Sequence, residues 1–357
     1  MKKNLVAVGS AMSLVSIIFI AIAFLREIVF ANYFGVTYEV DAYAVASQIP
    51  EIIFFIVCQS VNAIVIPLYS KLLYNESLSC ANRVLSNFIS VVFVGLLCVT
   101  LLFIAFAHVF IYIFAPGLQE ATHQLAVSLV RWTVPISIVD VFIAVYISIL
   151  NINNIFVRPK LISGLRFLIM IVSILTFSKY FGIYSVVWGM SCGIIIELLL
   201  YVFISRPYFT YNFFIDLHDP NILKASKQAL PVIISSGVTE LNLIIDRIIS
   251  SFLVTGSIAS LSYASKVSNI IYVIFINNLI VICYPRFAEL ASKKQTDKLI
   301  AFFVQTIRYA ILVCLPVIAG GILFKKEIIT IIFVRGMFHV SAIDNISQQR
   351  VQDRKMK

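Results

Sequence analysis

Long apolar runs constrain the fold of this sequence more than any other feature. The first extends from Leu5 to Leu25, and several later runs are as long or longer. A helix of about 20 residues crosses the hydrocarbon core of a bilayer, whereas strands of a membrane barrel are about 10 residues long and alternate in character. Hydrophobic residues make up 61% of the chain and charged residues only 12%, about half the charged fraction of a soluble domain. We therefore predict an all-α fold, a polytopic bundle of transmembrane helices.

About nine spans are predicted, separated where the backbone chemistry disfavours a continuous helix. Breaks fall at Pro116-Gly117, at 151–159 and at Arg206-Pro207. The first run is too long for the apolar core of a signal peptide, and no small-x-small site follows it, so it is predicted to be an uncleaved span. The predicted spans are 5–25, 40–70, 85–115, 124–150, 161–180, 183–205, 228–252, 258–290 and 299–323.

Lysine and arginine are distributed unequally between the two predicted sides of the membrane. With a cytoplasmic N-terminus, only Arg26, Lys179 and Arg247 lie on the outer side before residue 324. Positive residues favour cytoplasmic segments, so we predict that the N-terminus is cytoplasmic. The predicted cytoplasmic segments hold Lys2, Lys3, Lys71, Arg83, Arg158, Lys160, Arg206, Lys224, Lys227, Arg286, Lys293, Lys294 and Lys298.

A stripe of polar residues follows one face of the second predicted span, within the stretch from Arg26 to Pro67. At 100° per residue, Asp41, Gln48, Gln59 and Asn62 fall in one narrow sector, with Glu51 at its edge. Polar side chains facing lipid would be costly. The stripe therefore predicts one wall of a hydrated cavity inside a membrane protein.

An internal echo indicates two related lobes. Arg26 and Arg247, Gly35 and Gly256, Ser47 and Ser268, and Gln48 and Asn269 are each separated by the same interval. The eighth span repeats the polar face of the second, with Ser262, Lys266, Asn269, Asn277 and Tyr284 on one side. Parallel repeats of this kind are related by an axis along the membrane normal and enclose a cavity. We predict a six-helix N-terminal lobe (1–206), a connection (207–227), a partial C-terminal lobe (228–340) and a polar tail (341–357).

Several classes of function are disfavoured by the residue pattern. The six cysteines are scattered without a CxxC pair, and the four histidines are far apart in the sequence without metal-ligand spacing, so we expect no metal site. The net charge of +10 arises from residues between spans and forms no aromatic-interleaved patch, so nucleic acid is not an expected partner. The chain contains no Walker A motif or nucleophile elbow. We expect neither a cofactor nor an enzymatic reaction.

Several short motifs in the chain are characteristic of one family. Arg26-Glu27, Gly35, Asp41-Ala42, Ala46, Pro50 and Pro67-x-Tyr-Ser resemble the first helix pair of the MurJ/MviN lipid II flippases, within the multidrug/oligosaccharidyl-lipid/polysaccharide exporter superfamily. The stretches SFLVTGSIASLSYASKVSN and YPRFAEL resemble its seventh and eighth helices, and Arg335-Gly336-x-Phe338 a motif after the ninth. The resemblance implies a two-lobe bundle in the bacterial cytoplasmic membrane that moves a lipid-linked sugar precursor by alternating access.

The resemblance also implies a cavity whose basic residues hold the pyrophosphate of the undecaprenyl carrier. Arg26 and Asp41 match family positions, and Lys266 stands where the family usually has arginine. Ile20, Phe54 and Phe55 replace other arginines of the family, which leaves a different lipid-linked glycan open as cargo. The predicted substrate-binding residues are Arg26, Asp41, Gln48, Arg247, Lys266 and Asn269.

Alternative roles remain open for the charged residues. Arg26 fits either the cavity or a snorkelling position at a helix end, and Asp41 fits capping of the second helix or pairing with Arg26. Lys266 fits a ligand contact or neutralisation by Glu240 or Asp246. The residues Glu51, Arg131, Asp140, Arg166 and Glu197 are expected to form interior pairs that fix helix packing.

The expected function is flipping of lipid II or a similar precursor for peptidoglycan synthesis, with membrane lipids and other cell-envelope proteins as partners. The alternatives are an exporter of another lipid-linked polysaccharide, of O-antigen or capsule type, and an ion-coupled multidrug exporter. A non-functional product is a further alternative, because the family continues for several more helices and this chain is expected to be truncated at its C-terminus.

Overall fold

The computed structural model describes residues 2–272 and 295–324, together with the isolated positions 283, 286, 287, 290, 293, 327 and 330. Over these residues the regular secondary structure is entirely helical, which confirms the all-α prediction. The chain divides into two compact units, residues 1–259 and 260–357, and each is described by itself.

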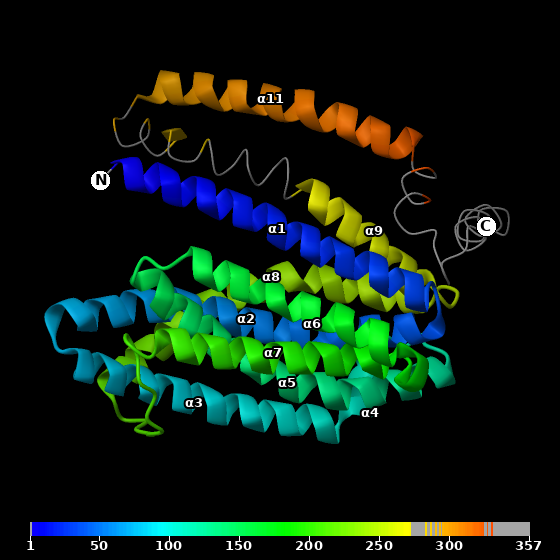
Figure 1. The fold of residues 1–357 in the computed structure, drawn as a ribbon, viewed down its shortest axis with the longest axis horizontal. Helices are drawn as coiled ribbons and strands as arrows, with labels where there is room; N and C mark the ends of the chain where they lie inside the picture. The colour runs from blue at the N-terminus through cyan, green and yellow to red at the C-terminus, as the bar shows by residue number, and fades with distance from the viewer. Residues whose placement is uncertain are drawn as a thin grey trace. The chain divides into compact units, whose positions relative to one another are not determined.

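The first unit is a bundle of long helices that run side by side (Figure 1). Its helices are α1 (Lys2–Phe34), α2 (Tyr38–Asn75), α3 (Leu78–Ala105), α4 (Ala107–Phe114), α5 (Glu120–Ile152), α6 (Val157–Phe181), α7 (Tyr184–Ser205) and α8 (Pro220–Ser251). The helix α2 packs against α5 and α8, while α6 packs against α1 and α7. The next helix, α9 (Ser257–Tyr272), begins in this unit and continues into the second.

Seven helices in the described part of the chain are long and apolar enough to cross a membrane. Six lie in the first unit, and the seventh is α11 (Thr296–Leu323) in the second. The chain is therefore a multi-pass membrane protein, as predicted. The count of about nine spans stays a prediction. The helix α8, at the span expected at 228–252, is not among the seven, and most of the span expected at 258–290 lies outside the described residues. Asn277, Tyr284 and the Arg335-Gly336-x-Phe338 motif also lie outside the described residues.

Several helix boundaries differ from the predicted spans; α1 continues to Phe34 and α3 begins at Leu78, for example. Two of the differences have local causes. The span expected at 85–115 is divided at Phe106 into α3 and the short α4. The helix α8 begins eight residues before the expected position 228, because the Asp219 side chain accepts from the Asn221 N–H at 2.8 Å and Pro220 occupies the first turn. A side-chain acceptor followed by proline is a favourable helix start.

A partly buried ion triad connects three helices of the first unit. Arg166 of α6 donates to Asp140 of α5 and to Glu197 of α7, each at 2.6 Å, and Glu197 is 1% exposed. The prediction of interior charge pairing is confirmed for these three residues. The side chains of Arg131 and Glu51, by contrast, are exposed.

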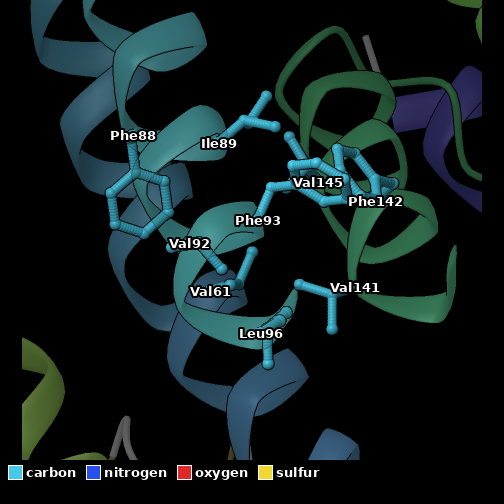
Figure 2. A pocket seen from close by; sticks show the side chains of 9 residues that line it. All are labelled: Val61, Phe88, Ile89, Val92, Phe93, Leu96, Val141, Phe142 and Val145. Atoms are coloured by element: carbon cyan, nitrogen blue, oxygen red, sulfur yellow. The ribbon is translucent and has the colours of Figure 1, made fainter. Parts of the chain in front are cut away.

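The core where α2, α3 and α5 meet is apolar and almost filled. Nine aliphatic and aromatic side chains line a small pocket there, and no polar atom reaches it (Figure 2). Phe93 of α3 and Phe142 of α5 face each other across it with ring centroids 5.5 Å apart. The pocket therefore lacks hydrogen-bonding groups for a polar ligand, and its lining residues serve to pack the three helices together.

Candidate functional site: a polar interface of α2 with α8 and α9

Asp41, in the first turn of α2, binds the start of a different helix. Its carboxylate accepts the backbone N–H of Gly256 and, at 2.7 Å, that of Ala259, both at the N-terminus of α9. The side chain is buried, with only 3% of the residue exposed. The sequence leaves capping of α2 and pairing with Arg26 open as roles for Asp41. Thr37 occupies the N-cap position of α2, and the Asp41 carboxylate satisfies free amides of α9.

Arg26 lies near the end of α1 and is largely buried. It forms an ion pair with the neighbouring Glu27, lies over the ring of Phe167 at 5.2 Å, and approaches the sulfur of Met170 at 3.9 Å. Phe167 and Met170 both belong to α6. Arg26 thus pairs with Glu27 on its own helix, and the contact with the Phe167 ring on α6 orients its guanidinium.

Gln48, in the first third of α2, and Arg247 join α2 to α8. The Nε of Arg247 donates to Gln48 Oε1, and Gln48 Nε2 donates to the Leu243 carbonyl at 3.2 Å. The carboxylates of Asp41, Glu51 and Asp246 lie close enough to interact electrostatically with Arg247. The Gln48 amide therefore helps to hold a cation at this interface. The residues Asp41, Gln48, Arg247, Gly256 and Ala259 are called the polar interface below.

Close backbone contacts surround the polar interface at the same end of the helices. Gly256 has a φ of 89°, and a Cβ there would lie 2.6 Å from Val36 Cγ1. Gly117 donates to Ser251 Oγ at 3.1 Å, and a Cβ on Gly117 would lie 2.6 Å from the Ser251 carbonyl oxygen. The turns after α1, α4 and α8 therefore approach one another at this end of the bundle without space for a side chain at either glycine.

The predicted stripe on α2 does not face one environment along its length. Asp41 and Gln48 face α8 and the start of α9, whereas Asn62 accepts from the Ser148 hydroxyl of α5 at 2.7 Å. Gln59 is exposed. A shared helical sector was thus not sufficient to predict one shared wall, because α2 contacts different helices along its 38 residues.

The remaining predicted residues, Lys266 and Asn269, lie on α9 in the second unit. Lys266 is half-buried and Asn269 is exposed. Their participation in a cavity with Arg26 stays a prediction. The echo itself has a local structural counterpart, since Gly35 and Gly256 both have positive φ (57° and 89°) in turns that join two helices.

The structure brings together two histidines that are separated in the sequence. The rings of His108 and His123 are T-shaped with centroids 4.5 Å apart, and His123 is 6% exposed. Among the described residues, no group of three or more His, Cys, Asp or Glu side chains is placed to share a metal ion. The pair supplies two imidazoles, fewer than the three protein ligands of a catalytic zinc site.

Sequence and structure comparisons identify the family. The sequence model of the lipid II flippase MurJ family matches residues 30–349. The chain belongs to the lipid II flippase MurJ family. A probable MurJ flippase from Rickettsia prowazekii is 28% identical over 88% of this chain, and one from Buchnera aphidicola (subsp. Schizaphis graminum) is 27% identical over 94%.

The solved structures support the same fold. A lipid II flippase MurJ in an inward closed conformation matches 93% of this chain, at 25% identity and a TM-score of 0.80. An inward-facing multidrug resistance transporter of the MATE family matches 92% at 14% identity and a TM-score of 0.70, which shows the shared fold alone. The chain covers 62% and 66% of the two MurJ relatives, so it spans about two thirds of their length.

The MurJ family is named for transport rather than for a catalysed reaction, which agrees with the multi-pass helical fold. Sequence reasoning missed the partners that fix the predicted residues, namely Phe167, Met170, Gly256 and Ala259. One signal in the sequence pointed to Gly256 and Ala259. Gly35 and Gly256 are separated by the repeat interval, which marks the turn before α9 as equivalent to the turn before α2.

Proposed function

We propose that this chain translocates an undecaprenyl-pyrophosphate-linked glycan precursor, lipid II or a similar molecule, across the bacterial cytoplasmic membrane for peptidoglycan synthesis. Membership of the MurJ family supports the cargo class. We further propose that the N-terminus is cytoplasmic and that the chain acts through two lobes, residues 1–206 and 228–340, joined by 207–227. The proposed activity requires no cofactor and no covalent chemistry within this chain, and other cell-envelope proteins are proposed partners.

The polar interface is the observation that carries the mechanistic part of this proposal. It buries a carboxylate and holds an arginine between helices that belong to different proposed lobes. Buried polar groups are stabilised only while their partners remain in place. Two discrete arrangements, with this end closed or open, therefore fit the chemistry better than a continuous deformation. Alternating access requires such a pair of states.

In the proposed cycle, Arg26, Arg247 and Lys266 attract the pyrophosphate while the opposite end of the bundle is open. Gln48 and Asn269 donate hydrogen bonds, and Asp41 holds the outer end closed through α9 until the lobes separate. A charge leaving a negative interior gains up to about 2.3 kcal/mol per 100 mV. The membrane potential is thus sufficient to favour outward movement of an anionic head group, and protein cations that accompany it would reduce this gain.

Flipping of a fluorescent lipid-linked precursor in proteoliposomes tests the proposal. Arg26→Ala and Lys266→Ala should each reduce transport by at least about tenfold, because each removes a charge-assisted contact to the pyrophosphate. Arg131→Ala is the matched control, since Arg131 is an exposed arginine on α5 outside the polar interface. Normal transport by both the Arg26 and Lys266 variants would refute the residue assignment. An inactive wild-type chain would refute the proposed function.

A further inference from the structure

The connection between α7 and α8 is bound along one face of α3. Asn87 of α3, fully buried, donates to the Asp216 carbonyl at 2.9 Å and accepts from the Asp216 N–H at 2.8 Å. The Asn212 N–H donates to Ser86 Oγ at 3.2 Å, and the hydroxyls of Ser90 and Tyr211 lie 2.9 Å apart. Residues 206–219, called the α7–α8 connection below, therefore form a fixed strap rather than a loose linker.

A cavity of about 360 Å³ opens between this connection and the first turns of α3. Its size falls within the range of small-molecule binding pockets. The lining consists of Ser79, Asn82, Arg83 and Ser86 from α3 and Thr210, Asn212 and Phe214 from the connection. The lining thus includes one cation and several hydroxyl and amide groups, and none of its members is a carboxylate.

Arg83 is positioned for a ligand in this cavity. Its guanidinium lies over the ring of Phe214, 5.1 Å from the centroid, which fixes the plane of the group. A planar guanidinium stacked on one face still presents N–H donors at its edge, and that geometry suits phosphate oxygens. The nearby Glu76 carboxylate accepts from the Cys80 thiol at 2.6 Å and is not part of the lining.

We infer that the cavity between α3 and the α7–α8 connection is a binding site for a phosphate group, distinct from the polar interface. Arg83 supplies the charge, and the hydroxyls of Ser79 and Thr210 supply neutral donors. The site lies at the end of a membrane-crossing helix, on the predicted cytoplasmic side, where phospholipid headgroups and soluble phosphate esters both have access. An occupant would tie the connection to α3 and so restrain the joint between the proposed lobes.

Two binding experiments on the purified chain distinguish the sources of phosphate. Calorimetric titration with glycerol 3-phosphate and with inorganic phosphate measures the soluble source. Native mass spectrometry with phosphatidylglycerol against phosphatidylcholine measures the lipid source. Arg83→Ala should weaken whichever phosphate binds by at least about tenfold, since hydrogen bonds to a charged group are among the strongest in proteins.

Arg206→Ala is the matched control, because Arg206 also lies over a phenylalanine ring, that of Phe203 at 5.5 Å, but does not line the cavity. Thr210→Glu is a second test that leaves Arg83 and its aromatic contact in place. The added carboxylate should abolish binding by repulsion while the thermal midpoint stays near that of the wild type. Equal losses in the Arg83 and Arg206 variants, unaffected binding in Thr210→Glu, or no phosphate binding by the wild type would overturn the inference.

Discussion

Replacing Asp41 with asparagine should loosen the contact between α2 and the start of α9 with little change in side-chain size. The carboxylate accepts two backbone N–H groups, from Gly256 and Ala259. A carboxamide offers one oxygen and one NH₂, so one of these amides would lose its acceptor or meet another donor. The negative charge at the N-terminus of α9 would also be lost.

The expected loss follows from these two effects. A hydrogen bond to a charged group contributes about 1.5–3 kcal/mol, and a charge at a helix N-terminus about 0.3–1 kcal/mol. Because asparagine keeps one bond, a net loss of about 2 kcal/mol is reasonable. If the contact exists only while this end is closed, that loss shifts the closed-to-open equilibrium by about 30-fold.

Labelling of a cysteine at position 251 measures the shift. Ser251 is 3% exposed and lies against Gly117 at the closed end, and serine to cysteine is nearly isosteric. The reporter Ser251→Cys is placed in a background in which the six native cysteines are replaced, and its rate of reaction with an impermeant maleimide is followed. Asp41→Asn should raise that rate by about 30-fold if opening and closing are faster than labelling.

Glu39→Gln provides the control, because Glu39 is also an acidic residue in the first turn of α2 but makes no contact with α9 that the structure records. The control should label like the parent. Equal labelling rates in the parent and the Asp41→Asn background would refute the reasoning, since Asp41 would then contribute the same stability to both states.

The remaining predictions concern stability, measured as thermal or denaturant unfolding in detergent. Gly256→Ala should lower the free energy of unfolding by more than about 1–2 kcal/mol, because φ is 89° and the new Cβ would lie 2.6 Å from Val36 Cγ1. Gly320→Ala is the control, because the space around this position in α11 is open; the free energy of unfolding should stay the same or rise by about 0.5–1 kcal/mol. Arg166→Met should cost about 3–5 kcal/mol, because it leaves two carboxylates without their cation, while Arg131→Met at an exposed position should change little. Similar effects within either pair would contradict the corresponding argument.

Much of the helical architecture could be predicted because a membrane span is recognised from the apolar composition of a single segment. The breaks near 116, 151–159 and 206 follow from proline, glycine and asparagine, and the structure has helix ends near each of them. The division at Phe106 and the early start of α8 were missed, since composition sets a span but local capping sets its ends. The polar face of α3 that Arg83, Ser86, Asn87 and Ser90 form was not predicted.

The site was predictable only to the level of a helix face. Helical periodicity placed Asp41, Gln48 and Asn62 together, but α2 meets α8 and α9 near one end and α5 farther along. Periodicity reports the angle of a side chain around its own axis. It carries no information about which helix lies opposite, and that depends on packing between distant segments.

The sequence by itself determined that this chain spans a membrane, where its helices break and which residue types must be kept away from lipid. Only the tertiary structure decided their partners. Asp41 lies 215 and 218 residues from the amides that it binds, and Asn87 lies 129 residues from Asp216. The physical reason is that each apolar segment is stable in the bilayer by its own composition. A buried polar group, by contrast, is stabilised by a particular partner that becomes its neighbour only when the helices have packed together.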